Sequence, residues 1–342
     1  MHILIIKTSS LGDIIHTFPA ICDAHQAIPN LRIDWLIEEQ FMPMVENHPC
    51  VHRAIACHWR HFNGNPLTYW KSPEWTTLKK DLRNTHYDAI IDLQGLLKSA
   101  LLVKLCRSKV THGYSWRSAR EPLSSLFYRH CHSISRQQNA ILRSRQLLAQ
   151  ALNYACPKTT PHYNWNNKHN STTTQHILLL TNTTWITKYW PRPRWITLGL
   201  ALVKHGYIPT LTWGTPIEKA FVDELSKEIP GSHVLPKTNM ADLHTFITHA
   251  SGFVGVDTGL THLATALSCP GVCLMGATDP NLTGPLGQHT YIQFKQLACS
   301  PCKQRQCQHK DYAPKVTPCM LAITPEQALA QLMEQIENKQ HQ

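Results

Sequence analysis

Short β-rich runs alternate with longer amphipathic stretches along most of the chain, and this alternation is the feature that most restricts its fold. Runs rich in aliphatic and β-branched residues are each followed by a stretch with helical periodicity. Such alternation is typical of parallel strands joined by crossover helices. In the first half, the predicted strands are 2–6, 32–37, 51–56 and 87–92, and the predicted helices are 13–26, 74–83, 96–105 and 139–152.

A polar stretch rich in Asn, Thr and His then interrupts the pattern, and a second alternating set follows it. Its predicted strands are 176–181, 207–213, 252–256 and 271–275, and its predicted helices are 216–228, 240–250, 258–267 and 324–338. A length of 342 residues suits two domains of ordinary size. The sequence therefore predicts two doubly wound α/β domains, residues 1–160 and 176–342, joined by a linker at 161–175.

The charge balance restricts the partners. Lys and Arg total 33 against 22 Asp and Glu, a formal charge of +11 that favours an anionic partner such as nucleic acid, an acidic membrane surface or a phosphorylated substrate. The apolar run 3–6 is far shorter than the roughly 18 residues of a membrane span. No cleavage pattern follows it, so we expect a cytoplasmic protein whose cysteines are mostly reduced thiols.

The loop that follows the first predicted strand places a carboxylate, Asp13, at the start of a helix. Open α/β sheets bind ligands beyond the carboxyl ends of their strands, where this loop lies. The loop has neither the G-x-G-x-x-G pattern of dinucleotide-binding proteins nor the G-K-[ST] of a P-loop. Asp13 is therefore either a catalytic group or an ordinary helix N-cap, and the residues alone leave both open.

A second turn of this kind runs from Asp257 to His262. Gly259 lets the main chain approach a ligand closely, and the N–H groups of the helix that begins there would face an anion. The pattern is typical of phosphate binding. Alternatively, Asp257 or Thr258 is a plain helix cap and His262 a structural histidine.

A third loop carries two hydroxyls and a cation, Thr183, Thr184 and Lys188. Lys188 would neutralise a leaving phosphate, so its loss should affect turnover more than folding. Glu218 follows the next strand and could bind ribose hydroxyls or serve as a favourable acid in the first turn of a helix. Because the chain has no Asp-x-Asp pair for a divalent metal, Lys188 and helix dipoles would have to stabilise a leaving diphosphate.

Four cysteines cluster late in the chain: Cys299, Cys302, Cys307 and Cys319. The first two form a C-x-x-C pair, and four thiolates at such spacing can form a closed tetrahedral zinc site. Four reduced thiols in a packed tail are the alternative.

Several segments together resemble the lipopolysaccharide heptosyltransferases of glycosyltransferase family nine. They are KTSSLGDIIHTFPA from Lys7, IDWLIEE from Ile33, YDAIIDLQGLLKSALL from Tyr87, HGYSWRSAREPLSSLFY from His112, KYWP from Lys188 and VDTGLTHLATAL from Val256. They occur in family order over most of the chain, and KSALL with SAREPLSSLFY favours the type I branch. The resemblance implies a GT-B fold and an inverting transfer of L-glycero-D-manno-heptose from ADP-heptose to a Kdo residue of the lipid A core, without a catalytic metal or cofactor.

The resemblance also implies roles for individual residues. Asp13 matches the proposed general base, and Lys188 would stabilise the leaving group. The positions that match the donor site are Thr183, Thr184, Lys188, Glu218, Asp257, Thr258, Gly259 and His262. The positions expected to bind the anionic acceptor are Arg60, Lys98 and Arg120. We expect a monomer, peripheral on the cytoplasmic face of the inner membrane, with no nucleic-acid partner.

Three other functions compete with this one. A sister transferase, such as a heptosyltransferase II-like enzyme or one with another nucleotide-sugar donor, would share most of the motifs. A nucleic-acid-binding protein would share the positive charge, but the chain has no helix-turn-helix or RNP-type pattern. A sugar-nucleotide epimerase or dehydrogenase is disfavoured by the missing G-x-G-x-x-G.

Overall fold

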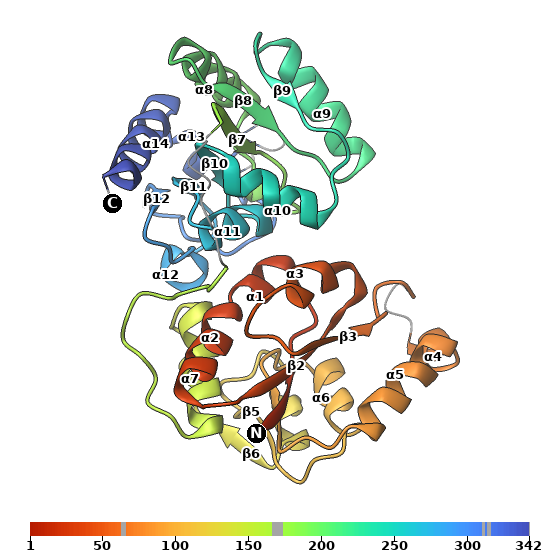
Figure 1. Cartoon of the computed structure of the whole chain (residues 1–342). Coiled ribbons are helices and arrows are strands. Elements are labelled where there is room, and N and C mark those ends of the chain that lie inside the picture. Colours follow the sequence, from red (N-terminus) through yellow and green to blue (C-terminus); the bar gives the residue numbers. More distant parts are fainter. Residues whose placement is uncertain (63–65, 166–173, 310–311, 313–315, 342) are drawn as a thin grey trace. The chain divides into compact units, whose positions relative to one another are not determined.

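The computed structural model describes residues 1–62, 66–165, 174–309, 312 and 316–341. The chain divides into two compact units, Met1–Trp165 and Asn166–Gln342, and the division falls inside the segment predicted as a linker. Much of that segment lies outside the described residues. Each unit is built on its own six-stranded parallel sheet (Figure 1).

The first unit has the strand order β3-β2-β1-β4-β5-β6, with every neighbouring pair parallel. The strands are β1 (His2–Ile6), β2 (Arg32–Glu38), β3 (Arg53–Cys57), β4 (Ala89–Asp92), β5 (Thr111–Tyr114) and β6 (His130–His132). From Ile3 onward every residue of β1 is buried, as expected for a central strand whose two faces are both covered by helices.

The helical segments of this unit are α1 (Leu11–Ile15), α2 (Phe18–Ala27), η1 (Glu39–Phe41), α3 (Met42–Glu46), α4 (Pro66–Trp70), α5 (Pro73–Asn84), α6 (Leu97–Val103), η2 (Pro122–Phe127) and α7 (Ala140–Leu152). The prediction of one helix over 13–26 is wrong, because the chain makes two helices with a break near Thr17. Pro19 causes the break: it has no N–H to donate, and its ring would clash with the carbonyl four residues earlier.

The second unit repeats the plan with the order β12-β11-β10-β7-β8-β9, again parallel throughout. Its strands are β7 (His176–Leu180), β8 (Ile208–Leu211), β9 (His233–Val234), β10 (Gly252–Val256), β11 (Gly271–Met275) and β12 (Thr290–Phe294). Its helical segments are η3 (Ile186–Lys188), α8 (Arg192–Lys204), α9 (Pro216–Lys227), α10 (Met240–His249), α11 (Gly259–Ala266), α12 (Pro280–Thr283), α13 (Pro318–Leu321) and α14 (Pro325–Gln340).

In both sheets the strand order reverses beside the first strand of the unit. The reversal lies between β1 and β4 in the first unit and between β7 and β10 in the second. Loops that leave such neighbouring strands in opposite directions open a crevice at the carboxyl edge of the sheet, which is where doubly wound proteins bind ligands. The loops after β1, β7 and β10 are those that the sequence predicted to carry chemistry.

Candidate active site

Asp13 lies in the third position of α1, and Ser10 is the N-cap of that helix. The main-chain N–H and the hydroxyl of Ser10 both donate to Asp13 Oδ2, at 3.0 and 2.8 Å. The suggestion that Asp13 itself is the N-cap is therefore wrong. Its carboxylate instead completes a capping box, an arrangement that satisfies helix N–H groups from both sides. These bonds fix the carboxylate at the carboxyl edge of β1.

Lys7 is the cation that accompanies Asp13. Its ammonium lies 4.0 Å from Asp13 Oδ1 and donates to the main-chain carbonyl of Leu93 at 3.0 Å, which bridges the ends of β1 and β4. Burial works against ionisation of Asp13, but the Lys7 charge and the bonds from Ser10 outweigh it and hold the pKa of Asp13 below its usual value. Asp13 is consequently a carboxylate at neutral pH and can accept a proton.

Two arginines extend this positive region. Burial lowers the pKa of Lys7, and the nearby charges of Arg143 and Arg120 lower it further. Both guanidinium groups are therefore close enough to the Lys7 ammonium to repel it. Arg120 was predicted to bind acceptor and is exposed. Arg143 was not predicted, because an arginine inside the helical pattern of α7 gives no signal in the sequence. It donates to the Ser118 carbonyl at 2.7 Å and stacks over Tyr114.

A second carboxylate lies at the same edge of the sheet. Glu38 ends β2, is 2% exposed, and accepts a hydrogen bond from the Arg60 main chain at 3.2 Å. No residue in the described part of the chain hydrogen-bonds its buried Oε1. Burial raises the pKa of Glu38 against the opposing charges of Lys98 and Arg60. The two cations were predicted from the sequence, but this acid, which lies directly after the predicted strand 32–37, was not.

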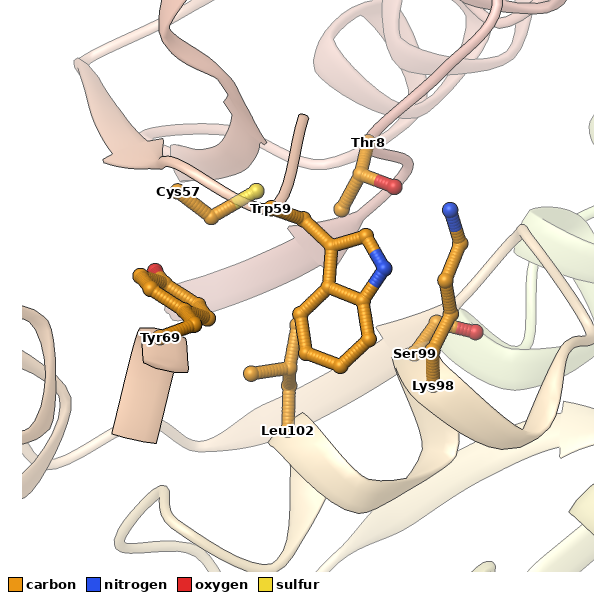
Figure 2. A pocket seen from close by; sticks show the side chains of 7 residues that line it. All are labelled: Thr8, Cys57, Trp59, Tyr69, Lys98, Ser99 and Leu102. Carbon is orange, nitrogen blue, oxygen red and sulfur yellow. The ribbon is translucent and has the colours of Figure 1, made fainter. Parts of the chain in front are cut away.

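Lys98 also stands at a small pocket at this end of the sheet (Figure 2). The pocket is lined by Thr8, Cys57, Trp59, Tyr69, Lys98, Ser99 and Leu102. The Trp59 indole lies among these side chains, edge-on to Tyr69 with 5.7 Å between ring centroids, and its nitrogen edge faces the side on which Lys98 stands. The indole and the ammonium thus border a pocket of about 10 Å³, which has room for about one water molecule.

In the second unit, Asp257 is the centre of the site. It is 4% exposed, and its carboxylate contacts Lys188 Nζ at 2.8 Å, Thr278 Oγ1 at 2.6 Å and His262 Nε2 at 3.2 Å. Burial works against ionisation of Asp257, but the His262 hydrogen bond and the Lys188 charge hold its pKa well below the usual range. The structure thus brings three predicted residues together and adds Thr278, which the sequence did not mark.

Lys188 has a structural partner that the sequence did not predict. Its ammonium bonds both the carboxylate and the main-chain carbonyl of Asp257, and lies 4.8 Å from the centre of the Trp185 ring. The sequence predicted a leaving phosphate as the partner of Lys188, and the structure adds this carboxylate. An ammonium carries three N–H groups, so these two bonds still leave one for a ligand.

The first turn of α11 lies directly beside this group. Thr258 is the N-cap residue and Gly259 the first helical residue. The main-chain N–H groups at a helix start have no partner within the helix, and the helix dipole adds partial positive charge there. This end of α11 therefore offers donors to an anion next to Lys188.

The remaining predicted residues lie on neighbouring loops. Thr184 is exposed, whereas Thr183 is half-buried and accepts weakly from the Trp185 main chain at 3.4 Å. Glu218 is the third residue of α9, and its Oε2 accepts from the main chains of Gly214 and Thr215 at 2.8 and 2.9 Å. Glu218 therefore completes a capping box, the helical role that the sequence had left open beside ribose binding.

One cluster with the geometry of a metal site lies elsewhere. His2, Asp34 and His52 are the group of His, Cys or acidic residues in the described chain whose ligand atoms all lie within 4.8 Å of one another. They stand at the amino ends of β1–β3, away from the loops described above. Arg53 bonds the same carboxylate at 3.1 Å, and such a neighbour disfavours a cation.

The chain is similar to several known proteins. The sequence profile of glycosyltransferase family 9 (heptosyltransferase) matches residues 75–313. Lipopolysaccharide heptosyltransferase 1 of Pseudomonas aeruginosa is 37% identical over 313 residues, which cover 91% of this chain and 88% of that protein.

Two solved structures of E. coli heptosyltransferase WaaC are also similar. The structure with ADP has a TM-score of 0.79 at 38% identity, and covers 85% of this chain and 92% of that one. The structure with ADP-2-deoxy-2-fluoro heptose has a TM-score of 0.77 at 36% identity, and covers 86% and 93%. The two doubly wound units are those of a GT-B enzyme, as predicted. Within the described residues, no helix is both long and apolar enough to cross a bilayer.

These matches cover most of the chain, and the matched structures share its two doubly wound sheets. The chain is a glycosyltransferase and belongs to glycosyltransferase family 9, the heptosyltransferase family.

Proposed function

We propose that this enzyme transfers L-glycero-D-manno-heptose from ADP-heptose to a Kdo residue of the lipid A inner core, with inversion and without a catalytic metal. The observation that carries the proposal is the state of Asp13. It is an ionised carboxylate at the carboxyl end of β1, beside Lys7 and near Arg120 and Arg143. A sugar hydroxyl is a poor nucleophile, so the transfer needs a base in this form.

The chemical step follows from this placement. As the acceptor oxygen bonds to the anomeric carbon, its proton passes to Asp13 and the bond to the diphosphate breaks, with the electron pair leaving on ADP. The nucleophile enters opposite the leaving group, which inverts the anomeric centre. Asp13 then returns its proton to solvent. The Lys7 charge keeps the carboxylate ionised before the step.

The donor side is supported by the second unit. Lys188 and the first turn of α11 both supply positive charge. The contact of Lys188 with Asp257 holds the ammonium next to this turn. These groups would stabilise the negative charge that grows on the diphosphate as it leaves. The related WaaC structures contain ADP and ADP-2-deoxy-2-fluoro heptose, which supports an ADP-sugar as the donor.

The acceptor side is supported by charge. Lys98 and Arg60 lie near Glu38, and Arg120 lies near Lys7 at the same edge of the sheet. Such cations suit the carboxylates and phosphates of an inner-core acceptor. We propose that a monomer works at the cytoplasmic face of the inner membrane, held there by its formal charge of +11.

Product analysis tests the proposal. The purified protein is incubated with ADP-heptose and Kdo–lipid A, and the product is measured by mass spectrometry with and without added Mg²⁺. We expect a mass increase of one heptose, equal in both conditions. UDP- and GDP-sugars, and an acceptor that already carries heptose, are the controls. Transfer only to the heptosylated acceptor would instead identify a sister transferase, and no transfer from ADP-heptose would contradict the proposed donor.

A further inference from the structure

Four cysteines of the second unit surround one cavity that the proposed reaction does not use. The cavity has a volume of about 110 Å³. Two separate segments of the chain, 299–309 and 317–319, bring Cys299, Cys302, Cys307 and Cys319 to its wall, and Thr187 and Ala277 complete the lining. We propose that these four thiols bind one thiophilic metal centre, either a zinc ion or iron.

The first pair lies in a turn that is anchored at both ends. Within the C-x-x-C segment 299–302, the Ser300 hydroxyl donates to the Gly276 carbonyl at 2.5 Å. Directly after it, the Lys303 N–H donates to the Ala277 carbonyl at 2.7 Å. Lys303 has a φ of 58°, a left-handed conformation that turns the chain sharply after the second cysteine. Both sulfurs are therefore held at the carboxyl end of β11.

Cys319 reaches the same point from the other segment. It lies in α13 and is 6% exposed. A Cβ atom on Gly276 would stand 2.8 Å from Cys319 Sγ, which is closer than real Cβ contacts come. The glycine thus leaves room for the sulfur against the main chain. Gly276 is consequently the place where the C-x-x-C turn and Cys319 meet.

The chemistry of the wall favours a metal over plain packing. A packed thiol needs no cavity around it, whereas these four line a shared one together with His309. Four cysteine thiolates bind zinc tetrahedrally, and they also bind iron–sulfur clusters. As the metal–sulfur bonds form, the four thiol protons leave to solvent.

The distances between the sulfur atoms do not distinguish a zinc ion from an iron centre. Among the described residues, no three of the four sulfur atoms lie within 4.8 Å of one another. Zinc, with Zn–S bonds of about 2.3 Å, requires sulfurs closer than this, so the turn would have to close around it. An iron–sulfur cluster is wider and needs less closure. The metal content of the protein decides between them.

The proposed centre would brace the loop that carries Lys188. Between the cysteines, the Gln304 carbonyl accepts from the Thr187 hydroxyl at 2.6 Å. The Arg305 guanidinium stacks on the Trp185 ring, 5.2 Å from its centre. Trp185 also lies under the Lys188 ammonium. A metal that orders 299–307 would therefore steady this loop, without itself taking part in the reaction.

Metal analysis of the whole protein tests the proposal. The chain is produced without a histidine tag, purified with a reductant and without chelator, and measured by elemental analysis and visible absorption. We expect about one zinc, or a stoichiometric amount of iron, per chain. Cys299→Ser and Cys302→Ser should each lose most of this metal. Cys131→Ser is the matched control, because Cys131 is exposed on β6 of the other unit, and it should keep all of it.

A thiol titration of the unchanged protein covers the case in which the serine variants fail to fold. An organomercurial should release the metal in step with modification of four thiols, and Ellman's reagent should modify those four more slowly than Cys131. The proposal is overturned if the wild-type protein holds far less than one metal, even after anaerobic addition of zinc, of ferrous iron, or of ferrous iron together with inorganic sulfide. A Cys299–Cys302 disulfide in the reduced preparation would overturn it equally.

Discussion

Lys188 Nζ lies 2.8 Å from Asp257 Oδ2, which joins the loop after β7 to the loop after β10. The two strands are neighbours at the point where the order of the second sheet reverses. Asp257 is buried and the ammonium is only 15% exposed at its side chain, so the pair is shielded from solvent. The same lysine therefore compensates a buried carboxylate and presents positive charge at the ligand-binding edge of the sheet.

Replacement of Lys188 should affect stability as well as turnover. Lys188→Ala leaves Asp257 without its cation, although His262 and Thr278 still contact it. We expect the free energy of unfolding to fall by about 2–4 kcal/mol and turnover to fall roughly a hundredfold. Adding Asp257→Asn to this variant should restore stability but not turnover.

Urea unfolding and steady-state kinetics separate these two effects. Lys219→Ala is the control, because Lys219 pairs with Asp223 on the exposed side of α9 and should change neither quantity by much. Unchanged kinetics in Lys188→Ala would remove this residue from the mechanism.

The cations near the first site should act on acceptor binding. Lys98→Ala and Arg120→Ala remove charges near Glu38 and Lys7 and should each raise the KM for acceptor about tenfold, with ADP binding unchanged. The effect should shrink as salt is added, because exposed charges are screened. Lys80→Ala, on the exposed face of α5, is the matched control. Initial rates against acceptor concentration measure the KM. An equal rise of the KM in Lys80→Ala would show that the effect comes from the overall surface charge and not from these two residues.

The predictable parts of the fold are the central strands, where a continuous run of apolar residues marks a buried strand. β1, β10 and β11 are buried runs of aliphatic residues, and the sequence predicts their bounds correctly. β5, β6, β9 and β12 were missed. Two of them, β6 with the sequence HCH and β9 with two residues, lie at the edges of their sheets. These edge strands are too short and too polar to show a pattern, and only pairing with a neighbour makes them strands.

The site was predictable where a loop follows a strand, and not where side chains meet across the sheet. Asp13 and Lys188 stand out in the sequence because they lie just after predicted strands. The contact of Lys188 with Asp257 joins positions 69 residues apart along the chain, and no local pattern encodes it. Glu38 was missed because its burial depends on the packing around β2.

A histidine pair should make the first unit acid-sensitive. His112 Nδ1 lies 2.9 Å from His132 Nε2, and His130 also stacks on the His112 ring. Burial lowers the pKa of His112 from 6.5 to about 4, helped by the charges of these two neighbours. The folded protein thus keeps His112 neutral while the unfolded chain protonates it. The resulting stability is present above about pH 6.5 and is lost as the pH falls toward 4.

His112→Asn should flatten this dependence. It removes the titrating group, so the free energy of unfolding should change less between pH 6.5 and 4.5 than it does in the wild-type protein. The difference between the two proteins should be roughly 3 kcal/mol at most. Urea unfolding at a series of pH values measures the slope. His162→Asn, an exposed histidine of the same unit, should leave the slope as it was. A slope unaltered by His112→Asn would assign the acid sensitivity to other groups.

The capping box at α1 gives Asp13 a structural role that must be separated from catalysis. Asn at this position can still accept from the Ser10 main chain through its side-chain oxygen, but it cannot take up a proton in the reaction. Asp13→Ala loses both abilities. Ser10→Ala removes only the hydroxyl that donates to Asp13. The three variants therefore separate the capping role of Asp13 from its proposed role as a general base.

Turnover of Asp13→Asn at saturating ADP-heptose and Kdo–lipid A is the most direct test of the account, with the melting temperature and ADP affinity measured on the same preparation. We expect turnover to fall a hundredfold or more, while melting and ADP binding stay near those of the unchanged protein. Ser10→Ala should lose some stability and keep most of its turnover. If Asp13→Asn retains full turnover while Asp13→Ala only loses stability, Asp13 is a capping residue and the enzyme uses another base.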